Sequence, residues 1–254
     1  MPTKRWELLY GIHPVLEALR AERRRFKEIY VSRKRQVRKE IADIIRIAES
    51  KDIPLKYRDD TYFDTILEPV VHQGVAARVN RYPFVDLSLI SRKYRTDDAV
   101  PLILVLDGVT DPQNLGSLIR TGLAAGVHGI VLPKNRSASP TPAVSKASAG
   151  ALEHIMIARV ANITLTLRQF KKEGLWIVGA DANAEQSIYG ADLRVGLALV
   201  LGGEEKGVRP LVKKTCDFLI SVPQQKIVSS LNVAIAGAVI MFEIVRQRKE
   251  NRAL

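Results

Sequence analysis

Three short segments of this 254-residue chain contain the residue types that a reaction on a bound ligand would use. The first reads Asn-Leu-Gly-Ser-Leu-Ile-Arg and runs from Asn114 to Arg120. An amide such as that of Asn114 can orient a substrate, and a guanidinium can bind a phosphate through two parallel hydrogen bonds. An arginine is unexpected in the apolar helical pattern around Arg120, although a helix cap at Asn114 and a salt bridge at Arg120 would explain both residues structurally.

The second segment contains paired glycines directly after an apolar strand pattern. Gly202 and Gly203 precede Glu204, and glycines at such a place let the backbone approach a ligand closely. Their spacing does not match the dinucleotide-binding fingerprint. Taken alone, this segment therefore predicts only a tight turn.

The third segment places polar side chains before the longest apolar helical pattern of the chain. Ser230 and Asn232 come immediately before Val233, where the apolar pattern becomes continuous. These side chains could face a ligand. An N-cap at Ser229 or Ser230 is the simpler structural explanation.

The elements that must position these segments alternate between strand and helix from Pro101 onward. Unbroken apolar runs are typical of strands that are buried on both faces of a parallel sheet. The runs are Leu102–Leu106, Gly129–Leu132, Ile155–Val160, Leu175–Gly179, Gly196–Leu201 and Phe218–Val222, and the helical patterns are Asn114–Ala125, Ala143–Glu153, Leu165–Glu173 and Ser230–Arg248. Because ligands of parallel sheets bind beyond the carboxyl ends of the strands, the three segments are expected at that edge.

The first 80 residues predict a separate, smaller α/β domain. Strands are expected at Glu28–Ser32, Ile53–Tyr57 and Gly74–Val79, and helices around Ile12–Leu19 and at Val37–Ser50. Residues 81–100 predict a linker, because Pro83 is followed by a short apolar piece and then by a charged or polar stretch. We therefore expect domains at 1–80 and 101–254.

A basic segment lies within this smaller domain. From Arg20 to Lys39 ten residues are basic and only two are acidic. This pattern predicts contacts with the phosphates of a nucleic acid, for which the candidates are Arg23, Arg24, Arg25, Arg33, Lys34 and Arg35. The alternative is a solvated helix face and loop.

The composition of the whole chain agrees with a polyanionic partner. There are 39 Lys and Arg against 27 Asp and Glu, which gives a net charge of +12. The single cysteine, Cys216, allows no intrachain disulfide, and no Cys/His spacing indicates a zinc site. We therefore expect no metal site. The longest apolar stretch is far shorter than the roughly 20 residues that span a bilayer, so we expect a soluble cytoplasmic protein.

In their order and spacing the three segments resemble the SpoU branch of the SPOUT methyltransferases, which methylate the ribose 2′-hydroxyl of RNA. The resemblance rests on Asn114–Arg120, on Leu201–Gly207, and on Ile220–Pro223 followed by Ser229–Val233. It covers about residues 101–248. Residues Tyr10–Val15 and His72–Ala76 resemble the substrate-binding domain of the ribosomal members, which is similar in fold to ribosomal protein L30e.

The resemblance implies an α/β fold with a C-terminal parallel-sheet SPOUT domain, a trefoil knot and a small N-terminal L30e-like domain. It implies that S-adenosylmethionine binds in the knot, mainly to backbone groups, and that two subunits complete each active site. The implied cofactor positions are Gly202, Gly203, Ile220, Val222 and Leu231, and the implied catalytic residues are Arg120, Asn114, Glu204, Ser230 and Asn232. The implied substrate is a guanosine of 23S ribosomal RNA.

The chain departs from the family pattern at two positions. Lys226 stands where a glycine is usual, which disfavours a left-handed backbone by roughly 1 kcal/mol. Ala234 stands where a serine is common. Both departures concern cofactor affinity more than the reaction.

Three other functions are compatible with parts of the pattern. The same chemistry on transfer RNA is the nearest, and a ribosome-assembly protein that binds RNA without turnover is the second. A Rossmann dehydrogenase is the least favoured, because its fingerprint is absent and no side chain is well placed for proton transfer.

Overall fold

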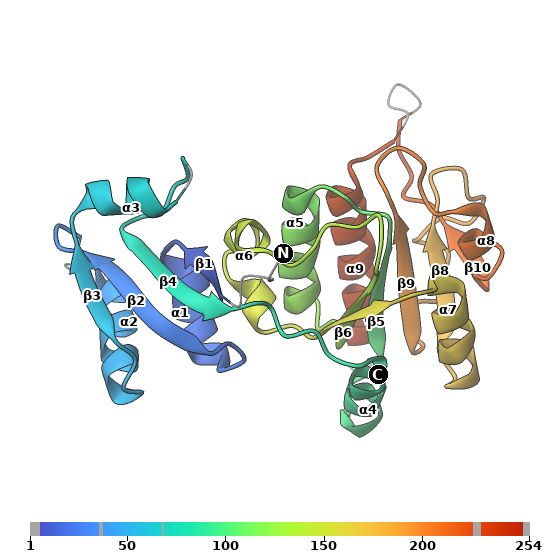
Figure 1. Cartoon of the computed structure of the whole chain (residues 1–254). Helices are drawn as coiled ribbons and strands as arrows, with labels where there is room; N and C mark the ends of the chain where they lie inside the picture. The colour runs from blue at the N-terminus through green and yellow to red at the C-terminus, as the bar shows by residue number, and fades with distance from the viewer. Residues whose placement is uncertain (1–5, 36–37, 68, 226–229, 251–254) are drawn as a thin grey trace. The chain divides into compact units, whose positions relative to one another are not determined.

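The computed structural model describes residues 6–35, 38–67, 69–225 and 230–250, and these residues fold into two compact units (Figure 1). The first unit extends to Pro83 and also includes Ser139–His154. The second contains Phe84–Ala138 and the rest of the chain from Ile155. None of the helices in the described part is long and apolar enough to cross a membrane.

The first unit is a four-stranded sheet with helices on both faces. Its strands are β1 (Trp6–Tyr10), β2 (Phe26–Ser32), β3 (Leu55–Arg58) and β4 (Val75–Asn80), in the order β1-β4-β2-β3. Only β2 and β3 pair in parallel. Its helices are α1 (Ile12–Ala21), α2 (Lys39–Ser50), α3 (Asp60–Ile66), α6 (Pro142–Ala147) and the 3-10 turn η1 (Ala151–Glu153). Apolar side chains of α1 and α2 fill the core on one face, and α3 packs Phe63 onto Tyr30 on the other.

The second unit is a parallel six-stranded sheet between two layers of helices. The strand order is β10-β8-β9-β5-β6-β7. The strands are β5 (Leu102–Asp107), β6 (Gly129–Pro133), β7 (Ile157–Val160), β8 (Trp176–Ala180), β9 (Leu197–Gly202) and β10 (Phe218–Ile220). The helices are α4 (Leu87–Thr96), α5 (Pro112–Ala124), α7 (Ile163–Lys172), α8 (Pro210–Lys213) and α9 (Val233–Glu250).

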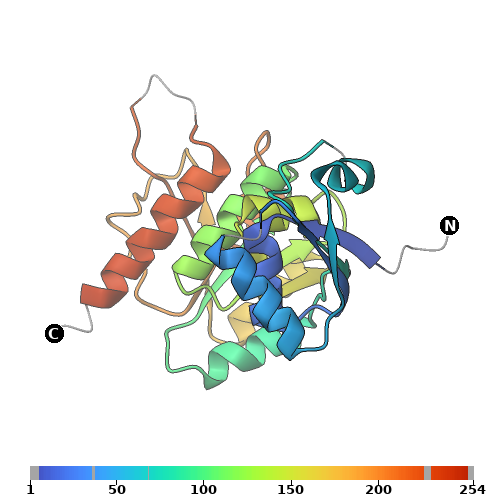
Figure 2. The same cartoon turned by 90° about the vertical axis from the view of Figure 1, so that its left-hand side faces the viewer.

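The alternation of side chains along β5 shows how the two layers of the second unit form. Ile103 and Val105 belong to a core shared with α4, α7 and α8. Leu104 points to the other face, beside Gly122 of α5. On that face α9 packs along α5, and both figures show the two helices side by side (Figures 1 and 2). The glycine Gly237 of α9 permits this approach, because a Cβ there would lie 2.6 Å from Leu118.

The structure corrects the predicted linker at 81–100. Helix α4 occupies much of that stretch, and its Ile90 and Tyr94 are buried in the core of the second unit. The stretch looked like a connector because most of its residues are charged or polar. An amphipathic helix needs only a few inward-facing apolar positions.

The predicted helix Ala143–Glu153 is also corrected. Helix α6 ends at Ala147, and Ala149 and Gly150 then adopt positive φ angles of 51° and 86°. A residue in the left-handed region ends a helix, and glycine adopts that conformation most easily. The chain continues into the short turn η1, and this whole piece belongs to the first unit.

Candidate active site

The turn after β9 requires both of its glycines. A Cβ on Gly202 would lie 1.9 Å from the carbonyl carbon of Gly207, and one on Gly203 would lie 2.4 Å from the Gly108 oxygen. The Gly203 N–H donates to the Asp107 carbonyl at 3.1 Å, and the Gly207 N–H donates to the Gly203 carbonyl at 2.9 Å. The loop therefore folds back on itself and rests against the end of β5.

An ion pair between the buried Asp107 and the partly exposed Arg209 holds this loop in place. The Asp107 carboxylate has no exposed surface and accepts from Nε of Arg209 at 2.8 Å and from the Arg209 backbone N–H at 3.0 Å. The hydrogen bond from the guanidinium raises the pKa of Arg209 despite partial burial. The far end of the glycine loop, at Arg209, is thereby attached to the end of β5.

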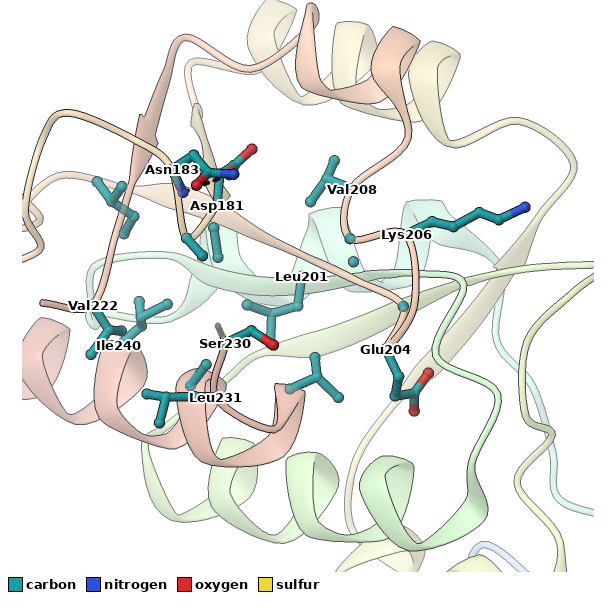
Figure 3. A pocket seen from close by; sticks show the side chains of 18 of the residues that line it. Asp181, Asn183, Leu201, Glu204, Lys206, Val208, Val222, Ser230, Leu231 and Ile240 are labelled. Carbon is teal, nitrogen blue, oxygen red and sulfur yellow. Dashed lines mark hydrogen bonds between the residues drawn. The ribbon is translucent and has the colours of Figure 1, made fainter. Parts of the chain in front are cut away.

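A cavity of about 340 Å³ opens beside the loop at the carboxyl edge of the sheet. One side is apolar, and Figure 3 shows Leu201, Val222 and Ile240 gathered there. Asp181 and Asn183, from the loop after β8, lie at the other end. The volume falls within the range of about 300–1,000 Å³ that is common for small-molecule sites.

All five predicted cofactor positions line this cavity, namely Gly202, Gly203, Ile220, Val222 and Leu231. Two of the predicted catalytic residues, Glu204 and Ser230, also line it. The cavity thus brings together the second and third sequence segments. Lys226 lies outside the described residues, and Ala234 is buried in the first turn of α9.

A chain of side-chain hydrogen bonds joins the three segments at the rim of the cavity. Asn114 donates from Nδ2 to Oε1 of Glu204 at 2.8 Å. Asn232 donates from Nδ2 to Oδ1 of Asn114 at 3.0 Å. Because 118 residues separate Asn114 from Asn232, this arrangement depends on the fold and not on local sequence.

The helix caps explain why these amides are available. Asp111, and not Asn114, caps α5: its carboxylate accepts from the backbone N–H groups of Gln113 and Asn114, both at 3.1 Å. At the start of α9 the cap is Asn232, whose Oδ1 accepts from the Ala234 N–H at 2.9 Å. The suggested cap at Asn114 is therefore wrong. Of the two suggested α9 caps, Ser229 lies outside the described residues and Ser230 faces the cavity.

Arg120 is not brought to this cavity. It lies exposed on α5, and within the described residues it makes no hydrogen bond or ion pair. The structural salt bridge considered for it is therefore not observed there. A free guanidinium on an exposed helix face is available to an external anion.

The polar end of the cavity, at Asp181 and Asn183, was not predicted from the sequence. Asp181 accepts hydrogen bonds from the Lys213 ammonium and, at 2.9 Å, from the Asn183 N–H. Burial alone would raise the pKa of Asp181, but these hydrogen bonds outweigh it and hold the pKa below its ordinary value. Its position directly after β8 is the signal that would have found it, because polar residues at the carboxyl ends of parallel strands are site candidates.

The predicted RNA-contacting residues separate into two groups in the first unit. Arg24 is corrected: its side chain has no exposed surface, and it donates from Nε to Glu153 at 2.7 Å and also pairs with Glu7. Arg23 donates to the Tyr82 hydroxyl at 3.2 Å, whereas Arg25 is exposed.

The second group lies after β2. Arg33 and Lys34 are exposed, and Arg35 forms an ion pair with Asp60 at 3.3 Å while its side chain stays 41% exposed. The loop lies beside the end of β3, since the Arg33 N–H donates to the Arg58 carbonyl at 3.0 Å. Its cations are therefore placed at the edge where the parallel strands β2 and β3 both end.

Two family models match the chain. Residues 101–242 match the SpoU rRNA methylase family, and residues 8–85 match the RNA 2′-O ribose methyltransferase substrate-binding family. The 23S rRNA (guanosine-2′-O-)-methyltransferase of Pseudomonas putida is 39% identical over 97% of this chain and 98% of that protein. The corresponding Escherichia coli K12 enzyme is 38% identical over 95% of this chain and 99% of that protein.

Solved structures show the same fold. The SpoU methyltransferase AviRb of Streptomyces viridochromogenes, crystallised with S-adenosylmethionine, superimposes with a TM-score of 0.80 over 97% of this chain and 92% of that chain. The sequence identity is 24%. This chain thus shares its fold with a structure whose sequence has diverged widely.

Proposed function

The chain belongs to the SpoU rRNA methylase family, and from this premise we propose that it transfers a methyl group from S-adenosylmethionine to the ribose 2′-hydroxyl of a guanosine in 23S ribosomal RNA. One observation supports this most strongly. The hydrogen-bonded side chains Asn114, Glu204 and Asn232 lie at the rim of the cavity that contains all five predicted cofactor positions. Such a cofactor supplies an electrophilic methyl group on a sulfonium centre.

The residues of the cavity fit S-adenosylmethionine by their chemistry. Leu201, Val222 and Ile240 offer an apolar wall for an adenine ring. Asp181 and Glu204 supply carboxylates, which suit ribose hydroxyls and positive charge. Backbone groups of the glycine loop can approach closely because no side chain intervenes.

The reaction requires that a base take the proton of the acceptor 2′-hydroxyl, and this requirement decides which role Arg120 can have. An arginine with a pKa above about 12 is a poor base near neutral pH. Arg120 therefore clamps the RNA phosphate and polarises the hydroxyl, and the phosphate or a water molecule takes the proton. Asn114, Glu204, Ser230 and Asn232 orient the reacting groups.

A second copy of this chain is included in the proposal. Arg120 does not line the cavity of its own chain, yet its role requires it at the reacting groups. Large apolar side chains are exposed on the same pair of helices: Leu123 of α5 is 38% exposed, and Ile235 and Phe242 of α9 are 56% and 50% exposed. A homodimer that buries this face would bring Arg120 of the partner subunit to the cavity.

The trefoil knot is also part of the proposal. Strand β10 lies at the edge of the sheet, whereas α9, which follows it, packs against β9 and α5 near the centre. Passage of the C-terminal segment through the loop after β9, between these two places, would form the knot.

RNA is proposed to contact the first unit through Arg33, Lys34 and Arg35. The exposure of these side chains suits phosphate contacts, which position an RNA without reading its sequence. The cytoplasmic location expected from the sequence stays a prediction.

Mapping of 2′-O-methyl groups tests the function directly. RNA from cells with and without this protein should differ by one guanosine of 23S ribosomal RNA, with transfer RNA unchanged. Loss of a methyl group from transfer RNA, with 23S ribosomal RNA unchanged, would instead identify transfer RNA as the substrate. No difference in either RNA, together with measurable cofactor binding, would favour an RNA-binding assembly protein.

A further inference from the structure

A second cavity, of about 520 Å³, lies on the other side of the glycine loop. It is lined by the loops that follow β5, β6 and β9, so it too opens at the carboxyl edge of the sheet. The two cavities share the residues from Gly203 to Gly207. A ligand in the second cavity would therefore meet Glu204, which belongs to the hydrogen-bonded chain at the rim of the first.

The polar groups of this second cavity fall into two classes. Asp107 is paired with Arg209, and Asp111 caps α5, so both carboxylates already have partners. The second class makes no hydrogen bond or ion pair with any residue that the structure describes and comprises the side chains of Thr110, Asn135, Arg136, Glu205 and Lys206. Figure 3 shows Lys206 pointing away from the apolar wall of the first cavity. The cavity thus offers unpaired donors and one unpaired carboxylate.

The loop that carries Arg136 is held in an unusual conformation. Arg136 has a φ angle of 56°, which is uncommon for a residue other than glycine. Two contacts hold its flanks: the Ala138 N–H donates to the Val109 carbonyl at 2.9 Å, and Arg159 donates to the Lys134 carbonyl at 2.7 Å. Such conformations persist where the surroundings impose them, and they concentrate at binding sites.

Two of these free groups, Arg136 and Glu205, together suit guanine. Guanine accepts hydrogen bonds at O6 and N7, to which two N–H groups of one arginine guanidinium can donate together. On its Watson–Crick edge guanine donates from N1 and N2, which a carboxylate can accept. Adenine carries a donor at N6, where Arg136 needs an acceptor.

We propose that the second cavity binds the base of the acceptor guanosine, with Arg136 donating to O6 and N7 and Glu205 accepting from N1 and N2. This inference rests on the proposed function and assigns its base specificity. The ribose would then extend toward Glu204 and Asn114, between the base and the first cavity. The cavity volume is sufficient for a nucleotide.

Single-turnover methylation with modified RNA tests the proposal. The substrate is a 23S ribosomal RNA fragment that carries guanosine or 7-deazaguanosine, which lacks the N7 acceptor, at the target position. The wild-type protein should react about tenfold or more slowly with 7-deazaguanosine. Arg136→Ala should lose a similar factor with guanosine and lose nothing further with 7-deazaguanosine. Lys134→Ala is the matched control, because Lys134 is exposed on the same loop and does not line the cavity.

Two readouts separate the outcomes. Calorimetric binding of S-adenosylmethionine should be the same for Arg136→Ala and the wild-type protein, which shows that the variant is folded. Equal wild-type rates on the two RNAs, or losses that add in Arg136→Ala, would overturn base recognition. A flatter salt dependence of RNA affinity in Arg136→Ala, with 7-deazaguanosine tolerated, would identify a phosphate contact and also overturn it. If the wild-type protein methylates neither RNA, the proposed function itself fails.

Discussion

Replacement of Arg24 by alanine should destabilise the first unit far more than it affects RNA binding. The Arg24 side chain is fully buried and lies against the equally buried carboxylate of Glu153, with Nε to Oε2 at 2.7 Å and Nη2 to Oε1 at 3.1 Å. It also pairs with Glu7 and donates to the Asn80 carbonyl at 2.9 Å. Alanine would leave the charge of Glu153 buried, with only the Ser145 hydroxyl as a described partner.

The magnitude follows from that loss. Removal of one member of a buried, hydrogen-bonded ion pair costs about 3–5 kcal/mol, because the remaining charge is desolvated without compensation. This is a large part of the total stability of a small domain, which is about 5–15 kcal/mol. Replacement of both buried charges, as in Arg24→Met with Glu153→Leu, should recover most of the loss, because the fully buried charge of Glu153 is then removed and only the partly exposed Glu7 loses its partner.

Urea unfolding followed by circular dichroism measures the effect. Arg25→Ala is the matched control, since Arg25 is exposed and its removal should change the free energy of unfolding by less than about 0.5 kcal/mol. A decrease of less than about 1 kcal/mol in the free energy of unfolding of Arg24→Ala would contradict a structural role of the buried ion pair. That role would also be contradicted if Arg24→Ala kept its stability but bound RNA more weakly.

Three further predictions concern the second unit. Arg120→Ala should slow single-turnover methylation by two or more orders of magnitude, about 3 kcal/mol, while the affinity for the cofactor measured by calorimetry stays unchanged. Arg120→Lys should stay strongly impaired if bidentate binding of the phosphate matters. Near-normal turnover by the alanine variant would reject the catalytic role. Because the pKa of Asp181 is held below its ordinary value of 3.8, its ionised form stabilises the folded state above that pH. The difference in the free energy of unfolding between wild type and Asp181→Asn, measured in urea, should therefore shrink as the pH is lowered. A difference that does not change with pH would contradict this. Burial raises the pKa of the Cys216 thiol to about 11. At pH 8 the native protein should therefore react with iodoacetamide about a hundredfold more slowly than the urea-unfolded protein, as followed by mass spectrometry. Equal rates would show an exposed thiol.

The parallel sheet and the location of the site could be predicted from the sequence because both follow from local patterns. The apolar run Leu102–Leu106 lies within β5, which is buried along its whole length. Once parallel strands are recognised, their carboxyl ends must meet at one edge. Gly202, at the end of β9, is therefore expected at this edge, and it lines the first cavity together with Ser230.

The connection between Arg24 and Glu153 could not be predicted in this way. The two residues are 129 positions apart, and Glu153 follows a helix in what looked like the second domain. Neither periodicity nor composition indicates that residues 139–154 pack with the first unit. A basic residue within a basic run reads as exposed, because nothing local indicates a distant partner.

The helix caps show where sequence reasoning stops and geometry must decide. Asp111 and Asn114 are comparable as cap residues in intrinsic preference, as are Ser230 and Asn232, so propensity does not choose between them. The choice matters because the side chain of a cap residue is occupied by hydrogen bonds to the backbone of the helix. With Asp111 as the cap, the Asn114 amide is free to bridge Glu204 and Asn232. Asn232 serves both purposes, since Oδ1 caps α9 while Nδ2 donates to Asn114. The site is thus oriented by the same hydrogen bonds that begin its helices, and a substitution at Asp111 should disturb it through the position of Asn114.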